Sequence, residues 1–189
     1  MKWLAISFFA LLSSACVTPG GERVTNFADR SAIYGWLDIS DVDANELHNV
    51  TIYQYLPKTD LPYFNVKVVE FQGGFLYYSF AFPNGSFGLS SATGRKCIGL
   101  CGNTIYNYDF GKQGDDIGRV RATEPGVYNL GAYKLVEVDT GLFEQDQFDI
   151  YPVENGPSEY DMLKAMLPDA ADKPEIEARL RAAIRAHEI

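Results

Sequence analysis

The feature of this sequence that most constrains its fold is a series of short segments with strand character between residues 31 and 153. Several alternate apolar with polar residues, as in FNVKV at 64–68. A period of two buries one face of a strand, and turn-forming residues separate the segments at short intervals. Eight or nine short strands with few helical stretches between them predict a mainly β fold, an antiparallel β-sandwich or barrel.

The expected strands, in chain order, are residues 31–39, 50–55, 64–71, 75–82, 86–90, 105–110, 119–123, 127–138 and 148–153. The stretch 75–82 is almost wholly apolar and aromatic, which predicts the middle of the core. Pro83-Asn84-Gly85 is a tight-turn signal and predicts a hairpin between 75–82 and 86–90. Residues 91–102 are expected to form a loop.

Residues 154–189 carry helical patterning and predict two short C-terminal α-helices. Ser158 and Asp161 have the spacing of a helix N-terminus, and Pro168 is expected to end this helix. Pro174 is expected near the start of the second helix, whose apolar stripe consists of Ile176, Leu180, Ala183 and Ile184. Two interpretations stay open: a helical pair docked on the sandwich, or a stripe offered to a partner protein.

Charge and composition narrow the classes of function. The 189 residues contain 16 Lys+Arg and 25 Asp+Glu, a formal charge of −9, which argues against a nucleic-acid partner. Hydrophobic residues make up 47%, enough for one packed core. His48 and His187 are the two histidines of the chain, which leaves little room for a His-based metal or catalytic site. We expect no metal, no cofactor and no catalytic residue.

Residues 1–15 have the layout of a secretory signal peptide, with Lys2 ahead of an apolar run and small residues behind it. The sequence Leu12-Ser13-Ser14-Ala15-Cys16 resembles the lipobox of bacterial lipoproteins. The resemblance implies that Cys16 becomes the first mature residue and carries lipid. Since Val17 stands where an inner-membrane lipoprotein has Asp, it also implies attachment to the outer membrane. The sequence leaves the face of the membrane open, and we expect the periplasmic one.

The remaining domain boundaries follow from these signals. Residues 16–30 are polar, with Pro19-Gly20-Gly21, and are expected to form a lipidated tether. Residues 31–153 are expected to form the β-sandwich domain and 154–189 the helical pair. Without Cys16 the chain keeps Cys97 and Cys101, most simply a disulfide in an oxidising compartment. Metal binding by this pair would need two more ligands, and a redox pair usually has two intervening residues instead of three.

The segment RATEPGVYNL at 121–130 places a Pro-Gly turn before Tyr128 and Leu130, which are expected to share a face. Gly126 is expected to take a positive φ. The segment resembles the Pro-Gly-x-Tyr-x-Leu hairpin of transthyretin-like and carboxypeptidase-regulatory-like sandwiches. With the lipobox in front, the chain resembles bacterial outer-membrane lipoproteins built on such a sandwich, and the resemblance implies a fold more than a role.

Familiar catalytic motifs are missing from the sequence. The acidic run at 41–45 starts like a calcium loop, but Glu46 and Ile52 stand where an EF-hand needs Gly and Glu. Residues 88–96 partly match a phosphate-binding loop, but the spacing of the two glycines is one residue too long and no Ser or Thr follows Lys96. The Gly-x-Ser-x-Gly motif of serine hydrolases is not present either. Paired carboxylates for glycoside chemistry stay open, because their separation in space decides.

One feature of the sequence bears on a binding role, a set of tyrosines in the expected strands: Tyr53, Tyr55, Tyr63, Tyr77, Tyr78, Tyr106, Tyr108, Tyr128 and Tyr133. If buried, they are core residues with a polar tip. If several face outward together, they suit contacts with a peptide, glycan or protein. We therefore expect a lipid-anchored, non-catalytic binding or assembly module whose partner is an envelope protein or glycan. The alternative is a small envelope hydrolase that uses paired carboxylates on glycan or peptidoglycan.

Overall fold

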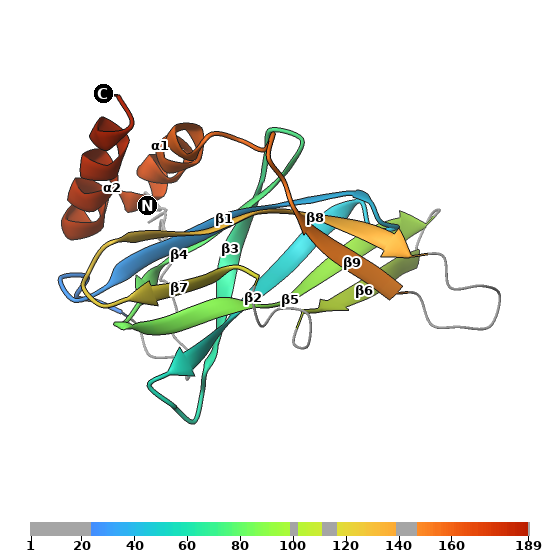
Figure 1. Cartoon of the computed structure of the whole chain (residues 1–189), viewed down its shortest axis with the longest axis horizontal. Helices are drawn as coiled ribbons and strands as arrows, with labels where there is room; N and C mark the ends of the chain where they lie inside the picture. The colour runs from blue at the N-terminus through green and yellow to red at the C-terminus, as the bar shows by residue number, and fades with distance from the viewer. Residues whose placement is uncertain (1–23, 99–101, 111–116, 139–146, 189) are drawn as a thin grey trace, which may run out of the picture.

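The computed structural model describes residues 24–98, 102–110, 117–138 and 147–188, and the fold is mainly β, with two C-terminal helices (Figure 1). The strands are β1 (Ser31–Asp41), β2 (Glu46–Leu56), β3 (Tyr63–Phe71), β4 (Gly74–Phe82), β5 (Gly85–Ile98), β6 (Gly102–Asp109), β7 (Arg119–Ala122), β8 (Val127–Val138) and β9 (Gln147–Pro152). The helices are α1 (Glu159–Ala170) and α2 (Pro174–Ala186). The expected fold class is confirmed.

The strands form one sheet that curls into a nearly closed, barrel-like sandwich. Their order is β6-β5-β2-β3-β4-β1-β8-β9, and β7 pairs with β5 beside this path. Neighbouring strands are antiparallel except β1 and β8, which run parallel. The two ends of the path meet through side chains, because the Tyr108 ring of β6 lies 5.1 Å from the Phe148 ring of β9, edge to face.

An inner core fills the space enclosed by the sheet. It contains the inward residues of the alternating strands, such as Val50 and Ile52 of β2, both fully buried. At its centre the rings of Phe64, Phe82 and Phe87 lie 4.8 to 5.8 Å apart. The apolar strand β4 is buried along almost its whole length, as expected, because one face contacts this core and the other contacts the helices.

Both hairpins expected from turn signals are wrong in their strand pairing. Residues 86–90 pair with β2 and β7 instead of β4, and β4 pairs with β3 and β1. Likewise β7 pairs with β5, while β8 pairs with β1 and β9, and Gly126 does not take a positive φ. Each turn carries the chain from one half of the sandwich to the other. A tight turn fixes a reversal of direction but not the strand that the returning segment joins.

The expected loop at 91–102 is also wrong, because β5 continues to Ile98 and β6 begins at Gly102. Residues 90–98 read SSATGRKCI, with no aromatic residue and with Thr93 and Ile98 as the β-branched ones, so the local preference for a strand is weak. The backbone of this segment nevertheless pairs with β2 on one side and β6 on the other. Pairing on both sides therefore outweighs the weak local preference.

The helices cover the outer face of β1 and β4 (Figure 1). Ser158 caps α1 as expected, with its Oγ accepting from the amide of Asp161 at 3.1 Å. The helix continues through Pro168 to Ala170, contrary to expectation. Met166 and Ala170 are fully buried around the proline, so packing on the sheet offsets the missing hydrogen bond.

Helix α2 begins at Pro174, and its apolar stripe packs on the sheet. Ile176, Leu180 and Ile184 are buried there. The stripe of α2 is therefore used inside the molecule, which confirms the docked interpretation of the helical pair.

An Arg179 clamp joins the N-terminal segment to α2. The Arg179 guanidinium donates to the carbonyl oxygens of Phe27 (3.0 Å), Ala28 (2.5 Å) and Arg30 (2.7 Å). The Phe27 ring packs on the same helical layer, with Lys173 Nζ 5.8 Å from its centroid. The last residues of the expected tether, 27–30, are thus held against the helical layer before β1 begins.

Candidate functional site

Three site residues expected from the sequence lie wholly or partly outside the described residues. Cys16 and Cys101 fall outside them, as do residues 1–15 and 16–23. The backbone of Cys97 lies in β5 opposite Asn103, and its side chain is not described. Lipidation at Cys16 and a disulfide between Cys97 and Cys101 therefore stay predictions.

The structure divides the nine tyrosines into a buried and an outward set. Tyr77, Tyr78 and Tyr108 are buried. Three more are partly buried against the inner core: Tyr106, Tyr128 and Tyr133. The outward set consists of Tyr53, Tyr55 and Tyr63, on the solvent side of β2 and β3.

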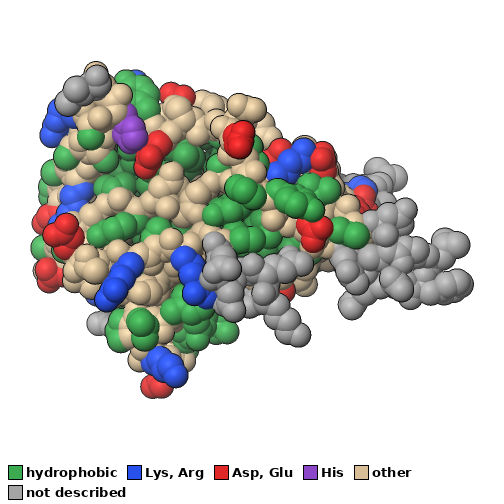
Figure 2. Space-filling model, in the orientation of Figure 1, with side chains coloured by type: hydrophobic (Ala, Val, Ile, Leu, Met, Phe, Trp, Pro, Cys, Tyr) green, Lys and Arg blue, Asp and Glu red, His purple; other side chains and the backbone are tan. Residues whose placement is uncertain are grey.

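These three residues form, with Leu56 and Leu61, an exposed patch that we call the tyrosine surface. The Tyr53 ring lies between the other two, 4.8 Å from Tyr55 and 5.1 Å from Tyr63, with interplanar angles of 75° and 61°. Tyr63, Leu56 and Leu61 are 57%, 57% and 56% exposed. The hairpin that joins β2 to β3 extends beyond the body of the sheet, and hydrophobic side chains gather on it (Figures 1 and 2).

Strand alternation explains why the tyrosines face outward. In β2, Ile52 and Gln54 point into the inner core, so Tyr53 and Tyr55 point to the other face. In β3, inward Phe64 places Tyr63 outside, directly opposite Tyr53. The register between β2 and β3 therefore brings the two rings together.

Tyr55 is held in place by a glycine and an arginine. Gly88 of β5 lies beside it, and a Cβ on Gly88 would come within 2.8 Å of the Tyr55 ring. The ring thus packs directly over the backbone of β5. On the same side the guanidinium carbon of Arg119 lies 4.4 Å from the ring centroid, a cation–π contact.

Amide and hydroxyl side chains continue from the tyrosine surface along the same outer face. Asn49 Nδ2 donates to Thr51 Oγ1 and to Asn65 Oδ1, both at 3.2 Å, and Thr51 Oγ1 donates to Asn65 Oδ1 at 3.1 Å. On β5 and β6, Thr93 Oγ1 donates to Asn107 Oδ1 at 3.3 Å. These neutral groups form a hydrogen-bonding surface beside the aromatic rings.

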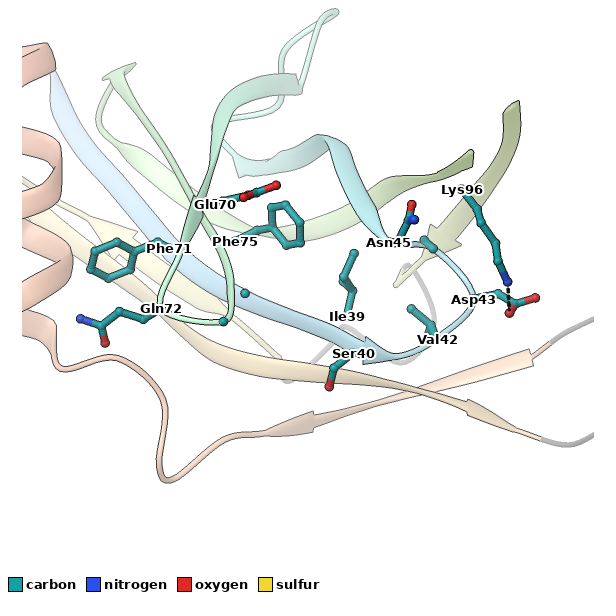
Figure 3. Close-up of a pocket in the computed structure, with 13 residues that line it drawn as sticks. Ile39, Ser40, Val42, Asp43, Asn45, Glu70, Phe71, Gln72, Phe75 and Lys96 are labelled. Atoms are coloured by element: carbon teal, nitrogen blue, oxygen red, sulfur yellow. Dashed lines mark hydrogen bonds and ion pairs between the residues drawn. The ribbon is translucent and has the colours of Figure 1, made fainter. Parts of the chain in front are cut away.

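A groove of about 630 Å³ lies elsewhere, between the β1–β2 connection and the β3–β4 turn (Figure 3). Ile39 and Phe75 contribute apolar walls, and Glu70 lies beside them on β3. Across the groove Lys96 Nζ forms an ion pair with Asp43 Oδ1 at 2.7 Å. The groove combines an apolar floor with a charged rim.

The Asp43 carboxyl of this groove does not have the raised pKa that a glycosidase needs in its proton donor. A hydrogen bond from Lys96 is the main cause that lowers the pKa of Asp43. Four described acidic residues have a pKa displaced from the ordinary value, and in each it is lowered: Asp41, Asp43, Asp169 and Asp172. A general acid needs a raised carboxyl pKa. Asp43 is therefore a carboxylate at neutral pH.

The two histidines lie on different elements. His48 is exposed on β2, and His187 follows α2, with its Nε2 3.6 Å from Glu159 Oε2. Within the described ranges, no group of three or more His, Cys, Asp or Glu side chains is placed to hold a metal ion. None of the described helices has both the length and the apolar character needed to cross a membrane.

Comparison of the chain with protein-family models, with curated proteins and with solved structures gives no match.

Sequence reasoning missed part of the tyrosine surface and its surroundings. Leu56 and Leu61 were not identified as exposed, because alternation from Gln54 places Leu56 inward and does not predict the register shift that lies between these two residues, and Leu61 lies between the strands, where alternation gives no orientation. Arg119 and Arg121 bracket Val120, and this alternation is the signal that places both guanidinium groups on one face of β7. The neighbour of that face depends on the pairing of β7 with β5, which the sequence did not predict.

Proposed function

We propose that this protein is a lipid-anchored, non-catalytic binding module of the bacterial cell envelope. In this proposal Cys16 attaches the chain to the outer membrane, and the domain faces the periplasm. The tyrosine surface binds a partner in the envelope. The observation that carries the proposal is the gathering of Tyr63, Leu56 and Leu61, each more than half exposed, on one protruding hairpin.

Exposed aromatic and aliphatic groups in one patch favour a binding role. A folded chain gains about 25 cal/mol for each Å² of apolar surface removed from water, so a partner that covers the patch gains this free energy on contact. Tyrosine is enriched at interfaces because it combines a large apolar ring with a polar hydroxyl. Tyr53 and Tyr55 extend the patch from the hairpin onto the sheet.

The state of the carboxyl groups supports a non-catalytic role. In the groove beside the β3–β4 turn, Asp43 is held as a carboxylate by Lys96. A hydrolase with paired carboxyls needs one of them protonated near neutral pH. This geometry favours binding over the hydrolase alternative.

The anchor is tested by intact mass and membrane flotation of the wild type beside Cys16→Ala. We expect the wild-type protein to carry lipid mass on Cys16 and to float with the outer membrane, and the variant to do neither. If both proteins lack lipid and stay in the soluble fraction, the envelope location is wrong.

The binding surface is tested with purified envelope fragments and detergent-solubilised full-length protein. Tyr53→Ala and Tyr63→Ala are expected to lower the fraction that co-sediments with the fragments by about tenfold, as expected when a central aromatic anchor is removed. Tyr151→Ala is the matched control, because Tyr151 is 51% exposed and lies on β9. Equal retention of all four proteins would show that the tyrosine surface is not the binding face.

A further inference from the structure

Basic side chains adjoin the tyrosine surface in a chain that is otherwise acidic. Arg119 and Arg121 are exposed on the outer side of β7, and Lys58 is exposed in the β2–β3 hairpin. The acidic groups nearest in sequence to these three are Asp60, Asp115, Asp116 and Glu124, and Asp115 and Asp116 lie outside the described residues. Figure 2 shows basic side chains over β7 and again at the hairpin.

A small pocket lies where the hairpin, β5 and β7 meet. It has a volume of about 250 Å³ and includes Leu56 and Pro57 on the hairpin side. Asn84, Ser86 and Arg121 supply amide, hydroxyl and guanidinium donors on the other side. Sites for drug-sized ligands measure about 300–1,000 Å³, so this pocket admits one ring or one charged group of a longer ligand.

Arg121 is suited to bind an anion in this pocket. The guanidinium is exposed and forms no hydrogen bond or ion pair with a described residue. Its planar fork donates two parallel hydrogen bonds to a carboxylate or phosphate. Arg119, two residues away on the same face, is stacked on Tyr55 and adds positive charge beside the rings.

The sheet around the tyrosine surface offers side chains to a ligand, but its backbone is already paired. Strand β2 lies between β3 and β5, so its backbone amides and carbonyls bond to its neighbours. An extended peptide therefore has no strand edge to join here. The face presents aromatic rings next to the amide and hydroxyl groups of Asn49, Thr51 and Asn65. Aromatic rings pack against the apolar C–H face of a sugar, and amides and hydroxyls bond to its hydroxyl groups.

We propose that the tyrosine surface binds an acidic polysaccharide. Sugar rings pack on Tyr53 and Tyr63, and an anionic substituent of the chain enters the small pocket and is held by Arg121. The shared chemistry is an anion on a sugar ring, supplied by the carboxylate of a uronic acid or by a phosphate ester. This proposal rests on the proposed binding function and names the class of its ligand.

The test measures binding of the full-length protein in detergent to three polymers by isothermal titration calorimetry: alginate, a phosphomannan and carboxyl-reduced alginate. We expect the protein to bind at least one acidic polymer and to bind carboxyl-reduced alginate at least about tenfold more weakly. Binding to alginate alone identifies a carboxylate and binding to phosphomannan alone a phosphate, and both results support the proposal. Raising the salt from about 0.05 to about 0.5 M is expected to weaken binding severalfold, because salt screens exposed charges.

Arg121→Gln is expected to lower the affinity for the acidic polymer about tenfold, as loss of one charge-assisted pair predicts. Arg185→Gln is the matched control, because Arg185 is exposed in the last turn of α2 and makes no contact with the sheet face. Circular dichroism melting checks that both variants are folded. The proposal is overturned if Arg121→Gln binds the acidic polymer like the wild type, or if carboxyl-reduced alginate binds as well as the acidic polymer that the protein prefers.

Failure of the ligand class can be separated from failure of the proposed function. If neither acidic polymer binds, but retention on envelope fragments still depends on Tyr63, the acidic-polysaccharide proposal is wrong and the binding function stands. If retention is also independent of Tyr53 and Tyr63, both are wrong.

Discussion

The outer surface of the sheet has two aromatic regions, of which one is covered by the helices and the other is exposed. On β1 and β4, Tyr34 and Tyr78 are buried beneath α1 and α2. On β2 and β3, Tyr53 and Tyr63 remain at the surface, and no described helix covers them. Both regions follow the same strand alternation, so periodicity alone does not separate core from surface.

In the covered region, the polar atoms of the aromatic side chains have hydrogen-bond acceptors. Beneath the helices, Tyr34 donates to Glu159 Oε1 at 2.5 Å and Tyr78 donates to Asp169 Oδ2 at 2.6 Å. Trp36 Nε1 donates to the carbonyl of Phe71 at 2.9 Å. Helix α1 thus provides carboxylate acceptors for Tyr34 and Tyr78, and strand β3 provides a carbonyl acceptor for Trp36. This match makes the covered region a second core and leaves the tyrosine surface available to a partner.

Removing apolar volume from the covered region should have the largest effect on stability. Leu180 of α2 is fully buried against the sheet, so Leu180→Ala is expected to lower the free energy of unfolding by about 2–4 kcal/mol. Urea denaturation followed by circular dichroism measures the change. A loss below about 1 kcal/mol would show that the helical layer contributes little to the folded domain.

Breaking the Arg179 clamp should have a smaller effect. Arg179→Gln removes three hydrogen bonds from the guanidinium to the 27–30 segment and is expected to cost about 1–2 kcal/mol. Limited trypsin digestion should cut faster after Arg30 in this variant. Arg185→Gln is the control. Equal cleavage rates after Arg30 in both variants would contradict a holding role for Arg179.

The pH dependence of Asp169 tests the acceptors of the covered region. Burial acts to raise the pKa of Asp169, but hydrogen bonds from Lys67 and Tyr78 outweigh it and hold the pKa below its ordinary 3.8. A carboxyl with a lowered pKa in the folded state adds stability above its unfolded value, and this stability is lost as the pH falls through the folded value.

Asp169→Asn should therefore cost about 0.5–1 kcal/mol at pH 7, since solvent screens the Lys67 pair, and the difference from wild type should shrink below about pH 4. Asp60→Asn, in the exposed hairpin, is the control variant. Unfolding at a series of pH values measures both differences. A difference for Asp169→Asn that stays constant down to pH 2 would contradict the role given to its charge.

The smallest effect on stability is expected for the uncovered region. Tyr63→Ala should change the free energy of unfolding by less than about 0.5 kcal/mol, because more than half of the side chain is already in water. The same variant is expected to lose binding. A destabilisation of about 2 kcal/mol or more would mean that Tyr63 belongs to the core, and its effect on binding would then be structural.

The sequence predicted elements well where local signals decide them. Strand β8 lies at 127–138 as expected, and Ser158 and Pro174 mark the helix starts. Strand pairing was not predicted, because the turns at Pro83-Asn84-Gly85 and Pro125-Gly126 cross between the halves of the sandwich. The extension of β5 beyond residue 90 was missed because its small polar residues form a strand through pairing with two neighbours.

The candidate site was predicted in part. The sequence identified the tyrosines but did not separate the buried from the exposed ones, because this separation depends on where the helices dock. The meeting of Tyr55 with Arg119 depends on β7 pairing with β5, a contact between residues 64 positions apart. Long-range pairing leaves no mark in the local sequence pattern.

The Arg179 clamp also determines where a mechanical load enters the domain. A pull transmitted along the chain toward its N-terminus reaches the three guanidinium hydrogen bonds at residues 27–30 before it reaches β1. All three bonds join residues that lie outside the strands of the sheet. Their release frees residues 27–30 as four residues of extended chain, with a length of about 14 Å. If Cys16 anchors the chain as proposed, this release lengthens the connection between the membrane and β1, and with it the distance at which the domain can meet a partner.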